Sequence, residues 1–308
     1  MVYTIILEED ITTSSRSQMI IVDMHQVLIS NIMAQLSMKS WKGTKEIGVV
    51  NKEMVRHMCC NSLRGYVRKF SNEYGWRNKN LILACDSADP WRRDYFPQYK
   101  WNRRQGREES KNDWDIMFKL ILEIKDEIAD NLPYKVIAVD NAEADDIIAV
   151  IVGMQEEDKY LIISGDKDFK QLQKFGNVFQ YSPIQKVMVE EPNPKRYLHE
   201  QIIKGDRSDG IPSILSPDDV FITKTKQSPI TKKRLEEWAQ VDDIPLGSQT
   251  KKYYNRNKKL IDFSMIPKSL ENAIINSYKN CKVPSRSKLL PYFMNYKLKS
   301  LIENINDF

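Results

Sequence analysis

The sequence predicts an α/β fold, in which helices flank a mostly parallel central sheet and a smaller helical region follows at the C-terminal end. Three observations predict this fold. Short continuous apolar runs recur along the first 190 residues, amphipathic helical patterns separate them, and the alternation stops near residue 190. Continuous apolar runs are typical of strands buried on both faces of a parallel sheet. Strand–helix alternation is typical of α/β domains.

The predicted strands share a short apolar run and an acidic residue that follows it closely. The runs are 19–22 (MIIV), 81–85 (LILAC), 135–139 (KVIAV) and 160–163 (YLII). The acids that follow them are Asp23, Asp86, Asp140 and Asp166. Because ligands of open parallel sheets gather at the carboxyl ends of the strands, we expect the functional site at that edge.

Helices are predicted between these strands. In residues 51–70 one helix face carries the side chains of Val55, Met58, Cys59, Ser62, Leu63 and Tyr66. Residues 114–129 repeat this trend, and residues 143–154 carry acids in the first turn, which the helix dipole favours. After residue 190 the stretches EPNPKRY and SPDD interrupt the pattern, and the remainder reads as helical with basic loops.

Composition excludes several classes of protein. The chain of 308 residues is 41% apolar and 29% charged, as in globular proteins that bury a large core. No apolar run reaches the roughly 18 residues of a membrane helix, and the N-terminus lacks the features of a signal peptide, so we expect a cytosolic protein. The four cysteines form no Cys-x-x-Cys pair and the three histidines lie far apart, which disfavours a disulfide framework, a zinc site and a Ser-His-Asp centre.

Positive charge is concentrated in two segments. Residues 91–111 hold seven Lys and Arg against three Asp and Glu, and residues 223–260 hold ten against four. Basic segments on either side of an acidic centre suit a polyanionic substrate. On charge alone, a solvated basic face explains them equally well.

Nine acids lie at strand ends and helix starts: Asp23, Asp86, Glu143, Asp145, Asp146, Asp166, Asp168, Asp206 and Asp209. Two unit charges 4 Å apart repel by about 4 kcal/mol at an effective dielectric constant of 20. Bound divalent cations with oxygen ligands relieve such repulsion. Each motif alone also fits an ordinary turn, loop or helix start, and it is their joint placement that favours metal binding.

The spacing of residues distinguishes the acids of one helix from one another and tests the sequence against other classes of enzyme. Glu143 and Asp146 are three residues apart and share a helix face, whereas Asp145 points elsewhere in a regular helix. The stretch GTKEIGVV has no lysine after its second glycine, so a Walker loop is excluded. An aspartyl phosphatase would need a second acid shortly after its nucleophile, and residues 24–27, which follow Asp23, contain none.

Five segments, IIVDMHQ, LILACDS, AEADDIIA, ISGDKDFKQL and IIKGDRSDGIP, together resemble the structure-specific 5′ nucleases, or flap endonucleases, and most closely the ribonuclease H branch of T-even bacteriophages. The similarity runs through nearly the whole chain, including WRRDYFPQYKWNRRQGREES and KLKSLIENINDF. It implies a 5′-nuclease or PIN-like α/β domain over 19–190. It also implies a basic arch over 91–111 that passes a single 5′ strand, and a helical DNA-binding domain over 191–308.

The resemblance also implies roles for the acids and for three bases of the arch. One metal site would use Asp86, Glu143, Asp146, Asp166 and Asp168, with Asp145 as a less certain ligand. A second, more open site would use Asp23, Asp206 and Asp209. Two Mg²⁺ ions, or Mn²⁺ in their place, would occupy these sites. Lys100, which matches the family's Tyr-Lys-x-Asn-Arg pattern, would offset charge on the scissile phosphate with Arg93 or Arg103.

The sequence departs from the family pattern after Asp209. Gly210 stands where the family has asparagine, and SILSPDDVFITKTKQ lacks the second set of glycines, so we expect a degenerate helix–hairpin–helix without the usual potassium site. Plain phosphate contacts would replace it. The expected nucleic-acid contacts are Arg92, Arg104, Arg107, Lys204, Lys224, Lys226, Lys232, Lys233 and Arg234.

The predicted function is therefore a Mg²⁺-dependent 5′ to 3′ exonuclease and flap endonuclease that removes RNA primers during lagging-strand replication. An inactive DNA-binding module and a metal-dependent phosphatase are the alternatives. The expected nucleic-acid partners are 5′-flap or forked DNA and RNA–DNA hybrid, and the expected protein partners are a single-strand-binding protein and a sliding clamp. We expect the protein to be a monomer in the host cytoplasm. Residues 1–18, with Ile5, Ile6 and Leu7, read as a docking peptide or a frayed tail.

Overall fold

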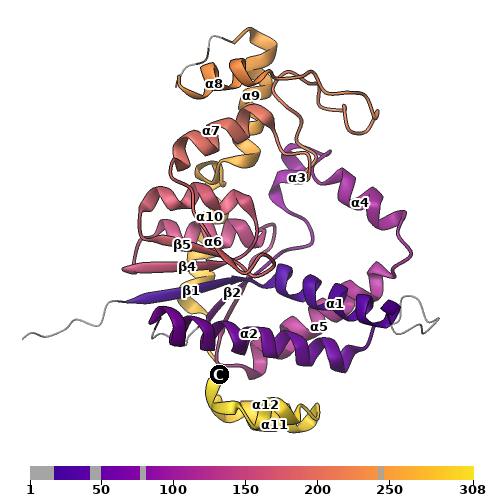
Figure 1. Cartoon of the computed structure of the whole chain (residues 1–308), viewed down its shortest axis with the longest axis vertical. Helices are drawn as coiled ribbons and strands as arrows, with labels where there is room; N and C mark the ends of the chain where they lie inside the picture. The colour runs from indigo at the N-terminus through magenta and orange to yellow at the C-terminus, as the bar shows by residue number, and fades with distance from the viewer. Residues whose placement is uncertain (1–16, 42–49, 77–80, 242–243, 245) are drawn as a thin grey trace, which may run out of the picture.

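The computed structural model describes residues 17–41, 50–76, 81–241, 244 and 246–308 (Figure 1). In this part of the chain a six-stranded sheet has the order β3-β2-β1-β4-β5-β6. Strands β1 to β5 pair in parallel, and β6 pairs antiparallel with β5 at one edge. The strands are β1 Gln18–Asp23, β2 Leu81–Cys85, β3 Lys135–Ala138, β4 Lys159–Ile163, β5 Val178–Ser182 and β6 Val187–Val189.

The four predicted strands are confirmed as β1 to β4, and so is the mostly parallel sheet. Strands β5 and β6 were not predicted. The sequence of β5, VFQYS, mixes polar and apolar residues, and β6 is three residues long. Gln180 in β5 is nevertheless buried, because its amide donates to the carbonyls of Ser164 and Asp166 and so holds the turn after β4.

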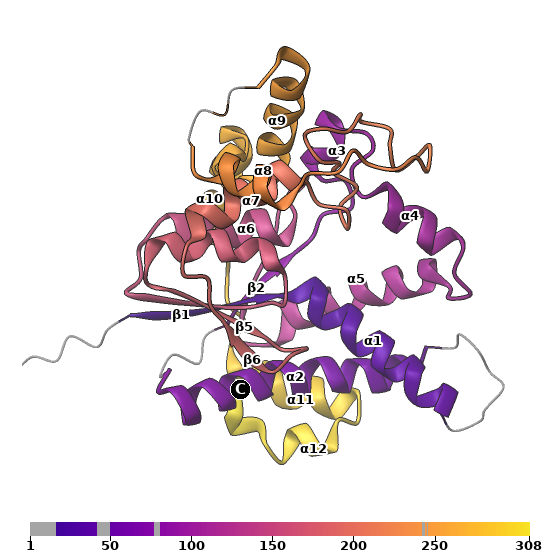
Figure 2. The ribbon, with the colours of Figure 1, turned by 45° about the horizontal axis from the view of Figure 1, so that its top comes forward.

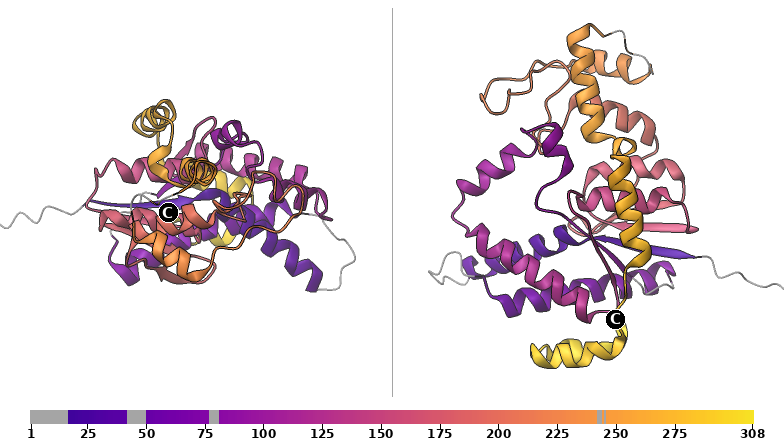
Figure 3. Two further views of the ribbon diagram at one scale, coloured as in Figure 1. Left: turned by 90° about the horizontal axis from the view of Figure 1, so that it is seen from above. Right: turned by 180° about the vertical axis from the view of Figure 1, so that it is seen from behind.

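Helices cover both faces of the sheet (Figures 1 and 3). Side chains alternate along each strand, so Ile20 and Val22 of β1 join one core while Met19 and Ile21 join the other. The first core packs against α1 Met24–Trp41, α2 Lys52–Tyr74 and α5 Trp114–Asn131. The second packs against α6 Ala144–Gly153 and α10 Lys268–Asn280. The predicted helices over 51–70, 114–129 and 143–154 correspond to α2, α5 and α6.

The C-terminal third divides between two places. Helices α7 Pro194–Lys204, α8 Lys232–Ala239 and α9 Ser248–Ile261 contribute to two small apolar clusters and lie above α6 and α10 in Figure 1. Figure 2 shows the same helices from another side. Helix α10 instead packs with α6 over one face of the sheet, whereas α11 Leu289–Asn295 and α12 Lys299–Ile302 join the other core on the far side of α2 (Figure 1). The expected domain boundary at residue 190 remains a proposal, since the helices after it do not all pack together.

The remaining elements are short. Between β2 and α5 the chain forms α3 Trp91–Tyr95 and α4 Trp101–Glu108, which stand away from the sheet in Figure 1. The described part of the chain also forms 3₁₀ helices: η1 Lys167–Phe175, η2 Phe263–Met265, η3 Arg286–Lys288 and η4 Ile305–Asp307. No helix in the described ranges is long and apolar enough to cross a membrane. All four cysteines are free thiols.

The loop after α7 is built around Gly205. This residue has a φ of +69°, and a β-carbon at its position would lie 2.3 Å from the carbonyl oxygen of Ile211. Two residues of α9 hold the same loop from the other side. The buried Arg256 donates to the carbonyl of Pro212 at 2.8 Å, and Asn257 donates to that carbonyl and to the carbonyl of Ile202.

Replacing Gly205 by alanine is expected to destabilise the protein by about 2–4 kcal/mol, because positive-φ strain adds to a backbone clash. The matched control is Gly65→Ala in the exposed middle of α2, where a β-carbon meets no atom within 4 Å. This control should raise stability by roughly 0.5–1 kcal/mol through its higher helix propensity. Urea unfolding measures both changes. Equal effects of the two substitutions would show that the loop tolerates a side chain at residue 205.

Candidate active site

Parallel strands bring the predicted acids to one edge of the sheet. Asp23 ends β1, Asp86 follows β2, and Asp166 and Asp168 follow β4. Because β1 pairs in parallel with both β2 and β4, these strand ends are neighbours. The remaining acids come from the start of α6 and from the loop after α7: Glu143, Asp145, Asp146, Asp206 and Asp209. Asp140, which follows β3, is exposed and takes no part.

Hydrogen bonds fix the acids on β1 and β4 through Ser164. The buried Ser164 hydroxyl donates to Asp23 Oδ2 at 3.0 Å and accepts from the Asp166 amide at 3.1 Å. Asp166 in turn accepts the Asp168 amide at 3.0 Å and so caps η1. The Gly165 amide donates to Gln26 at 2.7 Å. The stretch SGDKD is therefore a hydrogen-bonded turn that aims both aspartates at the sheet edge.

The start of α6 arranges a second group of acids. The Glu143 amide donates to Asp146 Oδ2 at 3.0 Å, and the Ala144 amide donates to Asp86 Oδ1 at 2.7 Å. Such contacts satisfy free amides of the first helical turn, where the helix dipole favours negative charge. Asp145 faces the cavity described below, whereas Asp146 is fully buried behind it. Glu143 and Asp146 lie together, as their spacing predicted, and share Arg92, while Asp145 reaches the cavity wall beside Glu143.

The carboxylates form two clusters, each with its ligand atoms within 4.8 Å of one another. One consists of Glu143, Asp145 and Asp146, and the other of Asp168, Asp206 and Asp209. The family resemblance placed Asp168 with the first group and Asp23 with the second. In the structure Asp23 instead shares the wall of a cavity of about 470 Å³ with Asp86, Asp145 and Asp166.

Tyr99 joins the two clusters. Its hydroxyl lies 2.9 Å from Glu143 Oε2 and 3.1 Å from Asp209 Oδ2, and its ring is almost completely buried. Four other aromatic residues lie in the same stretch, 91–101. Tyr99, Trp91 and Phe96 are buried and serve packing, while Tyr95 and Trp101 remain exposed.

Four basic side chains neutralise part of the acidic charge. Lys100 Nζ lies 2.5 Å from Glu143 Oε1 and 3.8 Å from Asp209 Oδ2. Arg103 Nη2 lies 2.5 Å from Asp209 Oδ1, and Lys167 Nζ lies 3.0 Å from Asp206 Oδ2. Arg92 is the fourth, and it is buried with Glu143 and Asp146. The arch therefore contacts the acids directly through Lys100 and Arg103.

Arg92 corrects one expectation. Its side chain is only 2% exposed, and its guanidinium contacts Glu143 at 2.9 Å, Asp146 at 2.8 Å and the carbonyl of Leu260 at 2.8 Å. A guanidinium with these partners does not reach a phosphate in solvent. Arg92 is an internal counter-ion for α6 rather than a nucleic-acid contact, because burying these carboxylates without a cation would be costly.

The other predicted bases lie at the surface, where their nucleic-acid contacts remain predictions. Arg93 pairs with Asp89 at 2.8 Å, and Lys204 pairs with Glu200 at 2.8 Å. In the arch, Arg104 lies over the ring of Trp101 and Arg107 over those of Trp114 and Phe118. The other bases outside the arch are all exposed: Lys224, Lys226, Lys232, Lys233 and Arg234.

Burial and charge shift the pKa values of the acids in opposite directions. Burial opposes ionisation of Glu143, but Lys100 and Arg92 lower its pKa to about 2. Burial and the nearby Asp86 raise the pKa of Asp23 to about 7. Burial, together with Asp166 and Asp209, raises the pKa of Asp168 well above its usual range. The basic side chains thus satisfy Glu143 but leave Asp23 and Asp168 short of positive charge.

The acids fit divalent metal ions. Asp168 Oδ1 is buried and has no hydrogen-bond partner among the described residues. It lies in the cluster with Asp206 and Asp209. Burial and repulsion from neighbouring carboxylates raise the pKa of both Asp168 and Asp209. Carboxylate oxygens are the ligands that Mg²⁺ and Mn²⁺ prefer. A bound cation would supply both the missing partner and the missing charge.

Raised pKa values predict that the metal-free protein loses stability as the pH rises from about 4 to 7. In this range the folded protein binds more protons than the unfolded chain, since the pKa of Asp23 is 3.8 when unperturbed and about 7 in the fold. The unfolding free energy therefore falls with pH, by on the order of 2–4 kcal/mol for Asp23. Glu143 acts in the opposite direction, but only below about pH 4.5, where its unfolded carboxyl takes up a proton.

Urea unfolding in EDTA between pH 4.5 and 7.5 measures this dependence, and Asp23→Asn should flatten it. Stability that rises across this range in the wild-type protein would contradict the assignment.

Sequence reasoning missed three features of the site. Tyr99 and Ser164 act through hydrogen bonds between segments far apart in sequence, and no local pattern marks them. His25, one of the three histidines that lie far apart in the sequence, lines the cavity with its Nδ1 3.6 Å from Asp86 Oδ2. Its position two residues after Asp23, in the first turn of a helix that begins at the sheet edge, was the available signal.

Comparison with known protein families gives two matches. Residues 18–201 match the family described as "5'-3' exonuclease, N-terminal resolvase-like domain". Residues 194–308 match the family described as "T4 RNase H, C terminal". The two matches together span nearly all of the chain.

Individual proteins agree with these families. The chain is 35% identical over 271 residues to ribonuclease H of Enterobacteria phage T4, which covers 84% of this chain and 88% of that protein. A zinc-bound structure of the phage T5 5′-exonuclease superposes with a TM-score of 0.55 at 15% identity, covering 85% of this chain and 98% of the other. A phage T5 flap endonuclease variant in complex with DNA and metal ions gives 0.54 at 14% identity, with 85% and 98% coverage. At this identity the T5 structures show a shared fold.

Proposed function

The chain belongs to the family of 5′-3′ exonucleases that includes phage T4 ribonuclease H, and on this premise we propose that it is a Mg²⁺-dependent 5′ to 3′ exonuclease and flap endonuclease. Its substrates would be RNA–DNA hybrid, duplex DNA and 5′-flap DNA, and its task the removal of RNA primers from the lagging strand. One observation carries the proposal. Acids from three strand ends, the start of α6 and the loop after α7 converge beside the basic segment 91–111, whose Lys100 and Arg103 contact them.

Two divalent ions would be held by the carboxylates of the two clusters, with Asp23, Asp86 and Asp166 at the cavity wall. When bound, such ions activate a water molecule and stabilise both the attacking and the departing oxygen of a phosphodiester. The product would carry a 5′-phosphate. Mn²⁺ would substitute for Mg²⁺, since both prefer oxygen ligands.

The protein's own side chains bind and orient. Lys100 and Arg103 line the acidic cavity and would place positive charge beside the scissile phosphate, where negative charge develops. Arg93 pairs with Asp89 and does not line the cavity, so it contributes there only if that pair opens. Tyr99 fixes the orientation of Glu143 and Asp209, and Arg92 fixes Asp146. The apolar side chains of Trp114, Phe118 and Phe169 form part of the cavity wall.

A 5′-labelled flap duplex and a 5′-labelled RNA–DNA hybrid test the proposal. The purified protein should cut both with Mg²⁺, release products with a 5′-phosphate, and stop cutting in EDTA. Binding without cutting would support an inactive DNA-binding module. Hydrolysis of a small phosphomonoester with no action on either nucleic acid would support the phosphatase alternative. Both results would overturn the proposal.

Further parts of the proposal concern organisation and partners. Residues 19–190 would form the nuclease domain and 191–308 the DNA-binding domain, and the protein would act as a monomer in the cytoplasm of the host. A single-strand-binding protein and a sliding clamp are the proposed protein partners. The docking peptide proposed for residues 1–18 lies, apart from Ser17 and Gln18, outside the described residues.

A further inference from the structure

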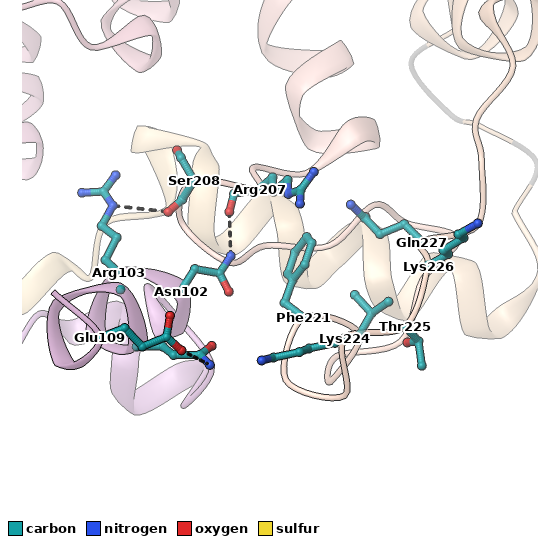
Figure 4. A pocket seen from close by; sticks show the side chains of 13 residues that line it. Asn102, Arg103, Glu109, Arg207, Ser208, Phe221, Lys224, Thr225, Lys226 and Gln227 are labelled. Atoms are coloured by element: carbon teal, nitrogen blue, oxygen red, sulfur yellow. Dashed lines mark hydrogen bonds between the residues drawn. The ribbon is translucent and has the colours of Figure 1, made fainter.

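A large groove lies between α4 and the chain that follows α7 (Figure 4). Its volume is about 1170 Å³, more than twice that of the acidic cavity. Its lining comes from three segments of the chain: residues 102–109 in α4 and at its C-terminal end, residues 207–208, and residues 220–227. Figure 4 shows Phe221 between Asn102 on one side and Gln227 and Lys226 on the other.

The groove and the acidic cavity share a wall. Arg103 and Gly106 of α4 line both spaces. Arg103 contacts Asp209 through Nη2 at 2.5 Å and donates from Nε to the carbonyl of Ser208 at 3.2 Å. A polymer that lies in the groove therefore reaches the carboxylates by crossing a single turn of α4.

The groove is positively charged. Arg103, Arg207, Lys224 and Lys226 line it, against Glu109 as its one acidic lining residue. The amide of Gln105 donates to the Glu109 carboxylate at 2.9 Å, which partly satisfies that acid. Arg207, Lys224 and Lys226 are exposed, and none of the three has an ion pair within the described residues. This charge selects a polyanion.

The segment that carries Phe221 is an ordered turn. The amides of Ile222 and Thr223 both donate to the carbonyl of Asp219 at 2.9 Å, and the amide of Thr225 donates to the carbonyl of Val220 at 3.1 Å. Lys224 has a φ of +55°, a left-handed conformation that is uncommon outside glycine. The turn thus presents the Phe221 ring and the Lys224 ammonium to the groove from a fixed backbone.

The uncharged lining residues distinguish a single strand from a duplex. Besides its bases, the groove offers an aromatic ring and the side-chain amides of Asn102 and Gln227. A duplex presents phosphates outward and keeps its bases stacked inside, so it has no face to place on Phe221. An unpaired strand exposes base faces that stack on aromatic rings and base edges that bind amides.

We propose that this groove binds an unpaired nucleic-acid strand beside the acidic cavity, with a base stacked on Phe221 and phosphates on Arg207, Lys224 and Lys226. The inference rests on the proposed nuclease function and adds to it a strand-binding site on the outer side of α4. The site would hold several nucleotides of the substrate that lie outside the acidic cavity.

Fluorescence anisotropy with a 5′-labelled oligothymidylate and with a blunt duplex, both in EDTA, tests the inference. Phe221→Ala and Phe221→Leu should each weaken oligothymidylate binding by about tenfold, the usual effect of losing one base–aromatic stack. Duplex binding should stay unchanged. Ile222→Ala is the matched control, because Ile222 is 40% exposed on the same turn and does not line the groove. Equal binding by the Phe221 and Ile222 variants, or equal losses for strand and duplex, would overturn the inference.

Salt dependence tests the phosphate contacts in the same assay. The double variant Lys224→Ala, Lys226→Ala should lower the slope of log affinity against log salt by about 0.7 for each lost contact. An unchanged slope would show that Lys224 and Lys226 do not contact phosphates, and would overturn their assignment to this site. Because EDTA prevents cleavage, the inference can fail separately from the function. If the protein cuts flap DNA but the Phe221 variants bind the single strand normally, the proposed strand-binding site is wrong and the nuclease function stands. If strand binding depends on Phe221 but the protein cuts no substrate, the proposed nuclease function is wrong and the strand-binding site stands.

Discussion

Replacing Asp168 by asparagine is expected to lower flap cleavage by about a thousandfold or more while leaving the metal-free protein as stable as the wild type or more stable. Asp168 lies in a cluster with Asp206 and Asp209 and has a buried oxygen with no partner among the described residues. Its removal takes away a metal ligand, and with it the charge stabilisation that a bound ion supplies. The loss of activity follows from this.

The stability gain has a separate cause. Burial and the neighbouring carboxylates raise the pKa of Asp168, so its ionised form is disfavoured in the fold. Asparagine has nearly the same shape and carries no charge, so at pH 8 the metal-free variant should gain on the order of 1–2 kcal/mol. Mg²⁺ should raise the melting temperature of the wild type and raise that of the variant much less.

Thermal melts with EDTA and with Mg²⁺, together with single-turnover cleavage of the flap duplex, measure these effects. Asp126→Asn on α5 is the control, because this carboxylate is 68% exposed and pairs with the neighbouring Lys125 at 3.2 Å. It should change neither property. A variant of Asp168 that loses several kcal/mol without metal would instead show that this aspartate has a structural role.

Asp166 and Asp168 looked equivalent in the sequence, and the structure separates them. Asp166 accepts the amide of Asp168 and caps η1, so its substitution removes part of a cap as well as a charge. Asp168 makes no such bond through its buried oxygen. The test of metal binding is therefore sharper at Asp168.

Local patterns in the sequence were enough to predict the sheet and the position of the acids. Strands β1 to β4 each contain a continuous apolar run. Their parallel pairing alone brings Asp23, Asp86 and Asp166 together. The strands β5 and β6 could not be found this way. Gln180 lies inside β5 only because the turn after β4 offers two carbonyls to its amide, and that contact depends on the fold.

The counter-ions of the site were also beyond local patterns. Arg92 and Arg93 are adjacent in a basic segment, and both were expected to contact the substrate, Arg93 at the scissile phosphate and Arg92 elsewhere on the nucleic acid. In the structure Arg92 is buried against α6 and α9, whereas Arg93 pairs with Asp89 at the surface. Which of two neighbouring arginines becomes an internal cation depends on the direction of a five-residue helix, α3, and that direction is set by tertiary packing.

Replacing Lys100 by methionine is expected to lower cleavage by about 10²–10³-fold and to destabilise the metal-free protein by about 3 kcal/mol. Lys100 Nζ is the cation shared by the two acid clusters, at 2.5 Å from Glu143 and 3.8 Å from Asp209. Without it, Arg92 is the one cation that still pairs with the buried Glu143 among the residues that the structure describes. Methionine retains the aliphatic length of the side chain, so the change removes mainly charge.

The metal should compensate for the lost stability but not for the lost activity. Divalent ions would restore positive charge near Glu143 and Asp209, so Mg²⁺ should raise the melting temperature of Lys100→Met more than that of the wild type. Cleavage should remain low at saturating Mg²⁺, because the ammonium that would face the scissile phosphate is still absent. The affinity for uncut flap DNA in Ca²⁺ should fall little, since the other exposed bases remain.

Lys111→Met is the matched control, because Lys111 is an exposed lysine just after α4 and lies outside the acidic cavity. It should cleave and melt like the wild type. Full recovery of cleavage by Lys100→Met at high Mg²⁺ would mean that Lys100 only balances charge among the carboxylates. Persistent loss of cleavage with recovered stability would separate two roles for one ammonium group, as a counter-ion in the metal-free protein and as a phosphate contact during the reaction.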